Sequence, residues 1–481
     1  MTDLPPYALI RQHFELPPTV EDRQFQIEAV NRLAPLSRSG WWAEVGTGKT
    51  LMATASVLYK KLQQPGIPCI VLMPPILLRQ WRRWLESITN RYTGRPLSVL
   101  EYRGTPKQRQ ALDLGAEFIL MSIQVFKNDY DHLLAKLARE PLVMIVDEAT
   151  SVKNVGSQNY RRVRDFTTGH DLLLLTGTPL SHPGDAYAYV KLISPGVYRN
   201  QRHFEALHVE NRDFFGNVTE WANLELLREN LLLNSVRILK EEALPYLKHP
   251  VYIPIRYELE PEHQALYRKL ADEQLLILED GGKIDATTTA KLYNCLQQII
   301  CNPGHFSGDP NMRSAAHELL DQTLDELSAD DPVNGEKLLV FANYNMTNRG
   351  LVEYLKPYNV VAAYGEVPVK RQIENIERFK TDPECRVAVL HPISAGQGTD
   401  GLQTVCSNSI FMEMPIVPKN FTQAVGRTYR DGQKAPAMVR MPIAEGTIQV
   451  RLHSQLLDTD ELVNKVQGGF KDLREAIYGV A

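Results

Sequence analysis

Short apolar runs that alternate with stretches of helical spacing constrain the fold of this chain more than any other feature. Before residue 180 these runs are residues 69–73 (CIVLM), 118–121 (FILM), 142–146 (LVMIV) and 172–175 (LLLL). Uninterrupted apolar runs of this length are typical of central strands in a parallel sheet that is covered on both faces. The stretches between them, such as 77–85, have helical spacing, so right-handed βαβ units are predicted.

The same alternation returns after a different middle section. Residues 194–335 contain longer, charged helical patterns, for example over 262–280 and 288–300, and residues 328–335 (SADDPVNG) have the composition of a linker. Strand patterns then resume at residues 337–342, 360–363, 386–390 and 409–412. We therefore predict an α/β protein with two tandem lobes, each built on a parallel sheet. The predicted parts are a first lobe over 1–245 with a helical protrusion from about 194, a helical insertion and linker over 246–335, and a second lobe with C-terminal helices over 336–481.

Composition excludes several other classes of protein. Of the 481 residues, 43% are hydrophobic and 23% charged, which excludes disorder as the main state. The net charge of −4 excludes a wholly basic coat protein but is compatible with a local basic groove. The five cysteines show no CxxC pairing, which argues against a disulfide framework and favours a reducing compartment. No apolar run has the length of a membrane span and no export pattern is visible, so a cytoplasmic protein without membrane partners is expected.

Residues 41–50 (WWAEVGTGKT) precede a helical stretch and predict a phosphate-binding loop. Successive backbone N–H groups of such a loop, together with the helix N-terminus behind it, bind phosphates, and glycines allow the close approach. Lys49 would reach the β and γ phosphates, and the Thr50 hydroxyl would bind magnesium. The nucleotide-binding candidates of the loop are Glu44, Val45, Gly46, Thr47, Gly48, Lys49 and Thr50.

A second candidate site follows the apolar run that ends at residue 146. Two carboxylates, Asp147 and Glu148, come directly after it. Open α/β sheets bind ligands at the carboxyl ends of their strands. Asp147 is therefore predicted to hold Mg²⁺, and Glu148 to polarise the attacking water during nucleoside triphosphate hydrolysis.

The order of these motifs resembles that of the superfamily II helicase-type ATPases, and more closely that of the Swi/Snf-like DNA translocases. The similar segments include residues 23–26 (RQFQ), 147–154 (DEATSVKN), 175–180 (LTGTPL), 296–303 (LQQIICNP) and 423–433 (QAVGRTYRDGQ). That superfamily tolerates alanine at the first position of the phosphate loop, where Ala43 stands. The resemblance implies two RecA-like P-loop NTPase lobes with a helical insertion between them.

The resemblance also implies roles for residues outside the phosphate loop. Arg23 and Gln26 would bind the adenine end of ATP, and Thr176, Gly177, Thr178 and Gln423 would couple the nucleotide state to lobe motion. Gly398 and Asp400 would complete the nucleotide site, although Asp400 stands where the family has asparagine. Arg427 and Arg430 would be arginine fingers that act on the γ-phosphate when the lobes close. Their spacing of three would put both on one face of a helix.

DNA, double-stranded or forked, is the partner that the resemblance implies, with ATP as the substrate. The candidate contacts are Arg79, Arg82, Arg83, Ser122, Lys153, Asn343 and Ser394. Contacts to phosphate and sugar carry no sequence code, so binding is expected to be salt-dependent and sequence-tolerant. Fork remodelling and branch migration are compatible activities, and replication or recombination proteins are further candidate partners. The compact motor suits a viral or bacterial source, with the host cytoplasm as its location if it is viral.

Three alternatives stay open at this point. A strand-separating helicase would use a hairpin or wedge, and none is readable in the second lobe. A nucleotide-gated DNA-binding scaffold would bind ATP without useful turnover, which the intact Lys49, Glu148 and arginine pair argue against. A motor subunit of a restriction-type complex would need a partner, since the chain has no nuclease or methyltransferase motif.

Overall fold

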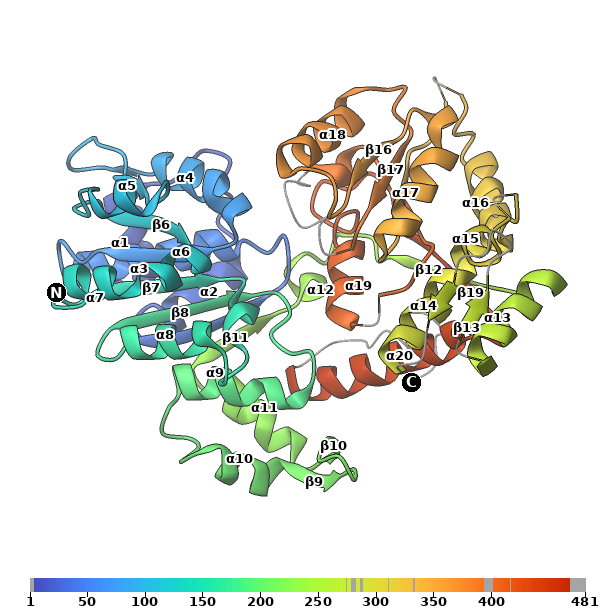
Figure 1. The fold of residues 1–481 in the computed structure, drawn as a ribbon. Helices are drawn as coiled ribbons and strands as arrows, with labels where there is room; N and C mark the ends of the chain where they lie inside the picture. The colour runs from blue at the N-terminus through green and yellow to red at the C-terminus, as the bar shows by residue number, and fades with distance from the viewer. Residues whose placement is uncertain are drawn as a thin grey trace. The chain divides into compact units, whose positions relative to one another are not determined.

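The computed structural model describes residues 4–273, 275–277, 283–285, 289–309, 311–331, 334–392, 401–415 and 417–467. Two compact α/β units make up the chain (Figure 1). The first contains Met1–Pro245 and Leu462–Phe470, and the second contains Tyr246–Glu461 and Lys471–Ala481. The chain therefore passes from the first unit to the second between Pro245 and Tyr246.

The first unit is built on a seven-stranded sheet with the order β11-β2-β8-β7-β3-β6-β5. All six strand pairs are parallel. The strands are β2 (Arg38–Ala43), β3 (Cys69–Met73), β5 (Val99–Glu101), β6 (Phe118–Ser122), β7 (Val143–Asp147), β8 (Asp171–Thr176) and β11 (Ser235–Ile238). The four predicted apolar runs are β3, β6, β7 and β8, whereas β2 and β11 contain polar residues and were not predicted.

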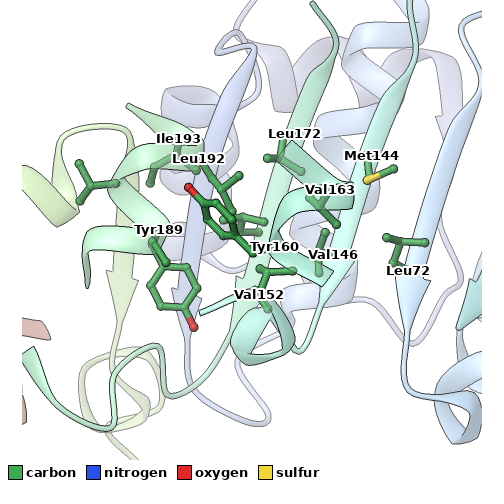
Figure 2. Close-up of a cluster of buried hydrophobic side chains, with 14 of the residues drawn as sticks. Leu72, Met144, Val146, Val152, Tyr160, Val163, Leu172, Tyr189, Leu192 and Ile193 are labelled. Atoms are coloured by element: carbon green, nitrogen blue, oxygen red, sulfur yellow. The ribbon is translucent and has the colours of Figure 1, made fainter. Parts of the chain in front are cut away.

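Two hydrophobic clusters cover the two faces of this sheet. Alternate residues of β3 enter opposite clusters, with Ile70 and Leu72 in one and Val71 and Met73 in the other. Figure 2 shows the first cluster, in which Leu72 lies in the same apolar layer as residues of β7, β8 and the helices beside them. Burial on both faces explains why these strands are apolar throughout, since each fully buried aliphatic side chain contributes about 1.5–3 kcal/mol.

Helices pack on both faces of the first sheet. The helices of the first unit are α1 (Pro6–His13), α2 (Gln24–Leu33), α3 (Lys49–Gln63), α4 (Leu78–Glu86), α5 (Pro106–Gln110), α6 (Ile123–Asn128), α7 (Tyr130–Leu137), α8 (Gln158–Phe166), α9 (Ala186–Ile193), α10 (Gln201–His208), α11 (Leu224–Leu232) and α12 (Lys240–Ala243). The short strands β1 (Phe14–Glu15) and β4 (Thr89–Asn90) pair with each other. The protrusion predicted from about residue 194 is not purely helical, because β9 (Val209–Arg212) and β10 (Val218–Trp221) form an antiparallel hairpin in it.

The second unit contains a six-stranded sheet with the order β12-β19-β18-β15-β17-β16, again with parallel pairs only. Its strands are β12 (Val251–Tyr257), β15 (Leu338–Phe341), β16 (Val361–Ala363), β17 (Val387–Leu390), β18 (Asn408–Phe411) and β19 (Met438–Ala444). The four strand patterns predicted after residue 336 correspond to β15, β16, β17 and β18. The segment 246–335 is not purely helical, because it begins with β12, an edge strand that pairs with β19 over seven residues.

Most of the remaining second unit is helical. Its helices are α13 (Pro261–Glu273), α14 (Thr289–Cys301), α15 (Pro303–Ser307), α16 (Ala315–Glu326), α17 (Asn345–Tyr354), α18 (Val369–Thr381), α19 (Pro418–Val425) and α20 (Ile448–Gln467), the last of which continues into the residues of the first unit. The helix predicted over 262–280 ends earlier, at Glu273, and β13 (Leu275–Ile277) then pairs with β14 (Lys283–Asp285). In the part of the chain that the structure describes, no helix is long and apolar enough to cross a bilayer.

Candidate nucleotide site

The phosphate loop connects β2 to α3 at the carboxyl edge of the first sheet. Trp41, Trp42 and Ala43 are buried at the end of β2, and the helix begins at Lys49. Gly46 and Gly48 have φ angles of 92° and 90°, a left-handed conformation that side chains with a Cβ rarely adopt. A Cβ at Gly48 would also collide with the side-chain amide of Gln26. The two glycines are therefore required by the backbone path of the loop.

Lys49 folds back over the loop in this structure. Its Nζ donates hydrogen bonds to the carbonyl oxygens of Ala43 at 2.7 Å and Glu44 at 3.2 Å. The Glu44 carbonyl also accepts from the Thr47 hydroxyl at 2.8 Å and the Thr47 N–H at 3.3 Å. The ammonium group thus occupies backbone acceptors that it would exchange for phosphate oxygens when a nucleotide binds. Thr50, in the first turn of α3, is half-buried.

Gln26 lies against the phosphate loop from α2. Its Nε2 donates to the Thr47 carbonyl at 3.0 Å, while its buried Oε1 has no hydrogen-bond partner. A buried acceptor without a donor costs about 1–3 kcal/mol, so a ligand with an N–H group is favoured beside it. The exocyclic amine of adenine has that chemistry. Arg23 precedes α2 and forms an ion pair with Glu21 at 3.8 Å.

The predicted acidic pair ends β7. Asp147 is 8% exposed; its Oδ2 accepts the Trp81 indole N–H at 2.8 Å and its Oδ1 accepts the Glu148 N–H at 2.9 Å. Burial and the neighbouring Glu148 charge raise the pKa of Asp147 to about 6, although the Trp81 hydrogen bond and the Lys49 charge act in the opposite direction. Glu148 has a φ of 53°, an unusual value for a residue with a side chain. Backbone strain of this kind is typical of functional sites.

The residues present fit a magnesium ion that also binds nucleotide phosphates. Mg²⁺ prefers oxygen ligands and is commonly held by one or two protein oxygens together with substrate phosphates. Asp147 supplies a buried carboxylate and Thr50 a hydroxyl at the start of α3. Among the described residues there is no group of three or more His, Cys, Asp or Glu side chains that could hold a metal without such a ligand.

The segment predicted to couple nucleotide state to motion follows β8 and touches the phosphate loop. A Cβ at Gly177 would lie 3.3 Å from the Ala43 carbonyl oxygen and 3.4 Å from the Glu44 Cα, tighter than most real Cβ contacts. The Thr178 N–H donates to the hydroxyl of Thr176 at 3.3 Å, and Thr176 is fully buried. Glycine at position 177 is thus what allows this segment to approach the loop.

The predicted arginines of the second unit do not lie on a helix. Gln423 belongs to α19, which ends at Val425, and the turn after it contains Arg427 and Arg430. The expectation that both arginines share one helix face is therefore wrong. Arg427 is 8% exposed, and Arg430 is half-buried with its N–H donating to Gln433 Oε1 at 3.1 Å. Ser394, Gly398 and Asp400 lie outside the described residues.

Some of the predicted DNA contacts are exposed, and the others already form hydrogen bonds within the protein. Arg79, Arg82 and Arg83 are exposed on α4, where Arg82 pairs with Glu86 at 2.7 Å and Glu101 at 3.3 Å. The other described candidates already bind the protein. Ser122 caps α6 through the Val125 N–H, Lys153 binds Ser181 and Asp185, and Asn343 donates to the carbonyls of Glu413 and Met414.

Two contacts of the site were not predicted. Trp81 holds the Asp147 carboxylate, and Arg237 reaches the phosphate loop from β11. Glu44 and Arg237 are separated by 193 residues along the chain, so no local pattern connects them. The only sequence signal for the first contact is weak: the indole N–H of a buried tryptophan usually finds a hydrogen-bond acceptor.

Two family models match most of this chain. The SNF2-related domain matches residues 26–305, and the helicase conserved C-terminal domain matches residues 318–432. The human protein "SWI/SNF-related matrix-associated actin-dependent regulator of chromatin subfamily A member 1" is 25% identical over 464 residues, covering 89% of this chain and 42% of that protein. The "DNA repair and recombination protein RAD54-like" of Drosophila persimilis is 26% identical over 502 residues, covering 89% of this chain and 62% of the relative.

Among solved structures, the "Sulfolobus solfataricus SWI2/SNF2 ATPase core in complex with dsDNA" is similar with a TM-score of 0.42 and 20% identity, over 93% of this chain and 97% of that chain.

The chain spans less than two thirds of the length of the curated relatives it matches, 42% and 62% for the two named above. Because the SNF2-related domain matches more than half of its residues, the chain belongs to the SNF2-related family.

Proposed function

We propose that this chain is a motor that hydrolyses ATP with Mg²⁺ and uses the reaction to move along double-stranded DNA. One observation carries the proposal: the phosphate loop after β2 and the acidic pair after β7 share one edge of the sheet, with only β8 between their strands. The Lys49 charge lies near enough to Asp147 to affect the pKa of that carboxyl. This pairing of a phosphate-binding lysine with a buried carboxylate is what triphosphate hydrolysis needs.

The chain's own residues would divide the work of hydrolysis. Lys49 would leave the Ala43 and Glu44 carbonyls and hold the β and γ phosphates, while Gln26 Oε1 would accept from the adenine amine. Asp147 and Thr50 would hold magnesium, which supplies positive charge beside the phosphates when bound. Glu148 would orient the attacking water, because its backbone is tied to Asp147. Arg427 and Arg430 would place charge on the γ-phosphoryl oxygens.

Double-stranded DNA is proposed as the track because of the family and because of the exposed cations on α4. The two relatives described above are named for chromatin regulation and for DNA repair and recombination. Fork remodelling or branch migration, a cytoplasmic location, and replication or recombination proteins as partners are finer parts of the same proposal. Exposed Arg79 and Arg83 are suited to phosphate contacts that are independent of sequence.

The test is the rate of ATP turnover with duplex, single-stranded and forked DNA. We expect duplex DNA to stimulate turnover, and Lys49→Ala to abolish it with every DNA. Stimulation by single strands alone would move the proposal to a strand-separating helicase. Phosphate release that is unchanged in Glu148→Gln would instead support a nucleotide-gated scaffold.

One feature favours strand separation as a second candidate function. The turn of the β9–β10 hairpin exposes two adjacent aromatic rings, Phe214 at 97% and Phe215 at 85%. Asp213 Oδ1 accepts the N–H groups of Phe215 at 3.0 Å and Asn217 at 2.8 Å, which orders the turn. Exposed aromatic rings on a rigid turn can stack on unpaired bases.

The charge of this hairpin counts against the second candidate. Glu210, Asp213 and Glu220 lie on it, and the charge of Arg212 is matched by Glu205 at 3.1 Å. A surface with this excess of carboxylates repels phosphates. A forked-duplex unwinding assay decides between the two: strand separation predicts that Phe214→Ser with Phe215→Ser abolishes unwinding while ATP turnover with single-stranded DNA stays intact.

A further inference from the structure

Arg237 connects three segments of the first unit that have no local relation in sequence. It lies on β11, the edge strand next to β2, and its side chain is 9% exposed. Its Nη1 donates to the carbonyl oxygens of Gly177 at 2.8 Å and Trp42 at 3.2 Å. Its Nη2 lies 3.3 Å from Glu44 Oε1. One guanidinium therefore contacts the end of β2, the phosphate loop and the coupling segment.

Glu44 is the point at which this connection enters the phosphate loop. Its Oε1 lies against Arg237 of β11, and its Oε2 accepts the N–H of Lys240, the first residue of α12, at 3.0 Å. Its backbone N–H donates to the Ile238 carbonyl at 3.1 Å, and its own carbonyl accepts from Lys49 and Thr47. Any change in the contacts of Lys49 therefore acts on a residue whose other side is anchored to Arg237.

Only an arginine can make this set of contacts. Its planar fork presents several N–H donors in fixed directions, whereas lysine offers a compact charge that cannot span three acceptors. Burial lowers the pKa of Arg237, and the charges of Glu44 and Glu242 act against that effect. Burying a charge is costly unless it is paired and hydrogen-bonded, and Arg237 meets this condition through Glu44 and two carbonyl oxygens.

We propose that Arg237 is a positioning residue that transmits the state of the phosphate loop to the coupling segment at Gly177. Gly177 lies so close to Ala43 and Glu44 that an added Cβ would be 3.3–3.4 Å from them, and Arg237 binds both sides of this approach. When Lys49 exchanges its loop carbonyls for phosphates, the Glu44 side chain stays on Arg237. The guanidinium then carries the displacement to the Gly177 carbonyl. This inference rests on the phosphate loop being the nucleotide site.

The test compares Arg237→Lys with Arg38→Lys, a matched control. Arg38 lies at the opposite end of β2 and donates to the carbonyls of Leu192 in α9 and Thr167 after α8, so it is also an arginine on β2 that binds backbone acceptors. We expect Arg237→Lys to lower kcat without DNA at saturating ATP by about tenfold, with ADP affinity changed by less than about threefold. Arg38→Lys should lower the melting temperature and leave kcat within about twofold of the unaltered protein.

A Glu44→Gln variant keeps the inference testable if Arg237→Lys fails to fold. It keeps one acceptor oxygen for the Lys240 N–H and replaces the carboxylate oxygen that meets Arg237 by an amide NH2, so kcat should fall about threefold to tenfold at unchanged ADP affinity. In Arg237→Lys with Glu44→Gln the two effects should not add, because both variants break one connection. Full kcat in both single variants, or a loss confined to nucleotide affinity, would overturn the proposal.

The readout separates this inference from the proposed function. If the unaltered protein hydrolyses ATP but duplex DNA does not stimulate it, the proposal of a DNA translocase is wrong. The inference about Arg237 can then still be tested, because it is measured by kcat without DNA. Equal losses of kcat in Arg237→Lys and Arg38→Lys would overturn the positioning role and leave the motor proposal intact. Absence of any ATP turnover in the unaltered protein would overturn both.

Discussion

The two sheets carry a buried carboxylate at comparable places, and the two carboxylates have different surroundings. Asp147 ends β7 in the middle of the first sheet, and Glu413 lies two residues after β18 in the second. Both are buried, 8% and 2% exposed. Burial raises the pKa of Asp147 to about 6 and that of Glu413 to about 7. Each is also bound by the segment that follows a neighbouring strand.

The donors around the two carboxylates decide what each can do. Glu413 Oε2 accepts the N–H groups of Asn343 at 2.8 Å and Tyr344 at 3.0 Å, and its Oε1 accepts the Thr347 hydroxyl at 2.5 Å. The Thr347 oxygen in turn accepts from Asn302 at 2.7 Å. Glu413 is therefore the centre of a closed network that fixes the backbone after β15.

Asp147 has fewer hydrogen-bond donors than Glu413, and it lies near the charged side chains of Lys49 and Glu148. It accepts only from Trp81 and Glu148 among the contacts described, and the charges of Lys49 and Glu148 both act on its pKa. A carboxylate at the carboxyl edge of a parallel sheet is thus a candidate site, and its donors decide between a structural and a chemical role. The following predictions test this difference, from the largest expected effect to the smallest.

Loss of the phosphate-binding lysine should have the largest effect. Lys49→Ala should reduce ATP turnover by at least about a thousandfold, because no other group of the loop supplies a positive charge to the phosphates. Steady-state phosphate release measures it. Lys61→Met is the control, since Lys61 is buried in the same unit but donates to the Ile67 and Glu117 carbonyls; it should lower stability and leave turnover unchanged. Undiminished hydrolysis by Lys49→Ala would refute the loop assignment.

Neutralising each carboxylate in turn should show that only the one in the first sheet is needed for ATP turnover. Asp147→Asn should lower kcat by about a hundredfold or more, because the isosteric amide keeps the shape and loses the charge that would bind magnesium. Glu413→Gln should leave turnover without DNA within about threefold, since the second carboxylate only fixes backbone. Phosphate release at saturating ATP and Mg²⁺ is the measurement. Comparable losses of kcat in both variants would contradict the assignment of a chemical role to Asp147 and a structural role to Glu413.

The stability effect of Glu413 should depend on pH. Its pKa is raised in the folded protein from 4.5 to about 7, so the folded state keeps the proton over a range in which the unfolded state has lost it. The stability that Glu413 contributes is therefore fully present below pH 4.5, decreases as the pH rises towards 7, and is constant above that. The free energy of unfolding of Glu413→Gln relative to the unaltered protein should rise by about 3 kcal/mol over this interval. Urea unfolding at a series of pH values checks this sign; a flat difference contradicts it.

Reversing exposed cations on α4 should have the smallest effect. Arg83→Glu should weaken duplex binding by about tenfold at low salt and flatten its salt dependence. Arg82→Glu should do less, because Glu86 and Glu101 already match the charge of Arg82. Fluorescence anisotropy with duplex DNA at several salt concentrations measures both. Unaltered affinity in Arg83→Glu would remove α4 from the DNA-binding surface.

Most of the sheet architecture could be predicted because it has a local signal. β3 covers the predicted residues 69–73, and the other buried runs of both lobes appear as strands to within two residues. β2 and β11 were missed because polar residues interrupt them, and their burial comes from neighbours that are distant in sequence. The helix expected over 262–280 ended early for a related reason, since periodicity alone does not mark where a helix stops.

The sequence predicted which residues lie at the site better than it predicted what each of them contacts. Lys49, Asp147 and Glu148 stand where the motifs predicted them, at one edge of the first sheet. The DNA contact of Lys153 stays a prediction; in this structure its Nζ donates to Ser181 at 2.8 Å and lies 3.1 Å from Asp185 Oδ2. Arg427 and Arg430 were expected on a helix, but the turn after α19 contains them. The partners of Lys153 lie 28 and 32 residues away along the chain, outside the window that a local pattern covers.

The amino-acid sequence by itself determined which segments become buried strands and where the phosphate-binding loop lies, since strand alternation and loop glycines act within about ten residues. The tertiary structure alone decided how the charges are used. Strand order places Arg237 against Glu44 and Glu413 against Asn343, and no periodicity specifies strand order. A buried charge takes the partner that folding brings within hydrogen-bond distance, so its role follows from the packed sheet rather than from its neighbours in sequence.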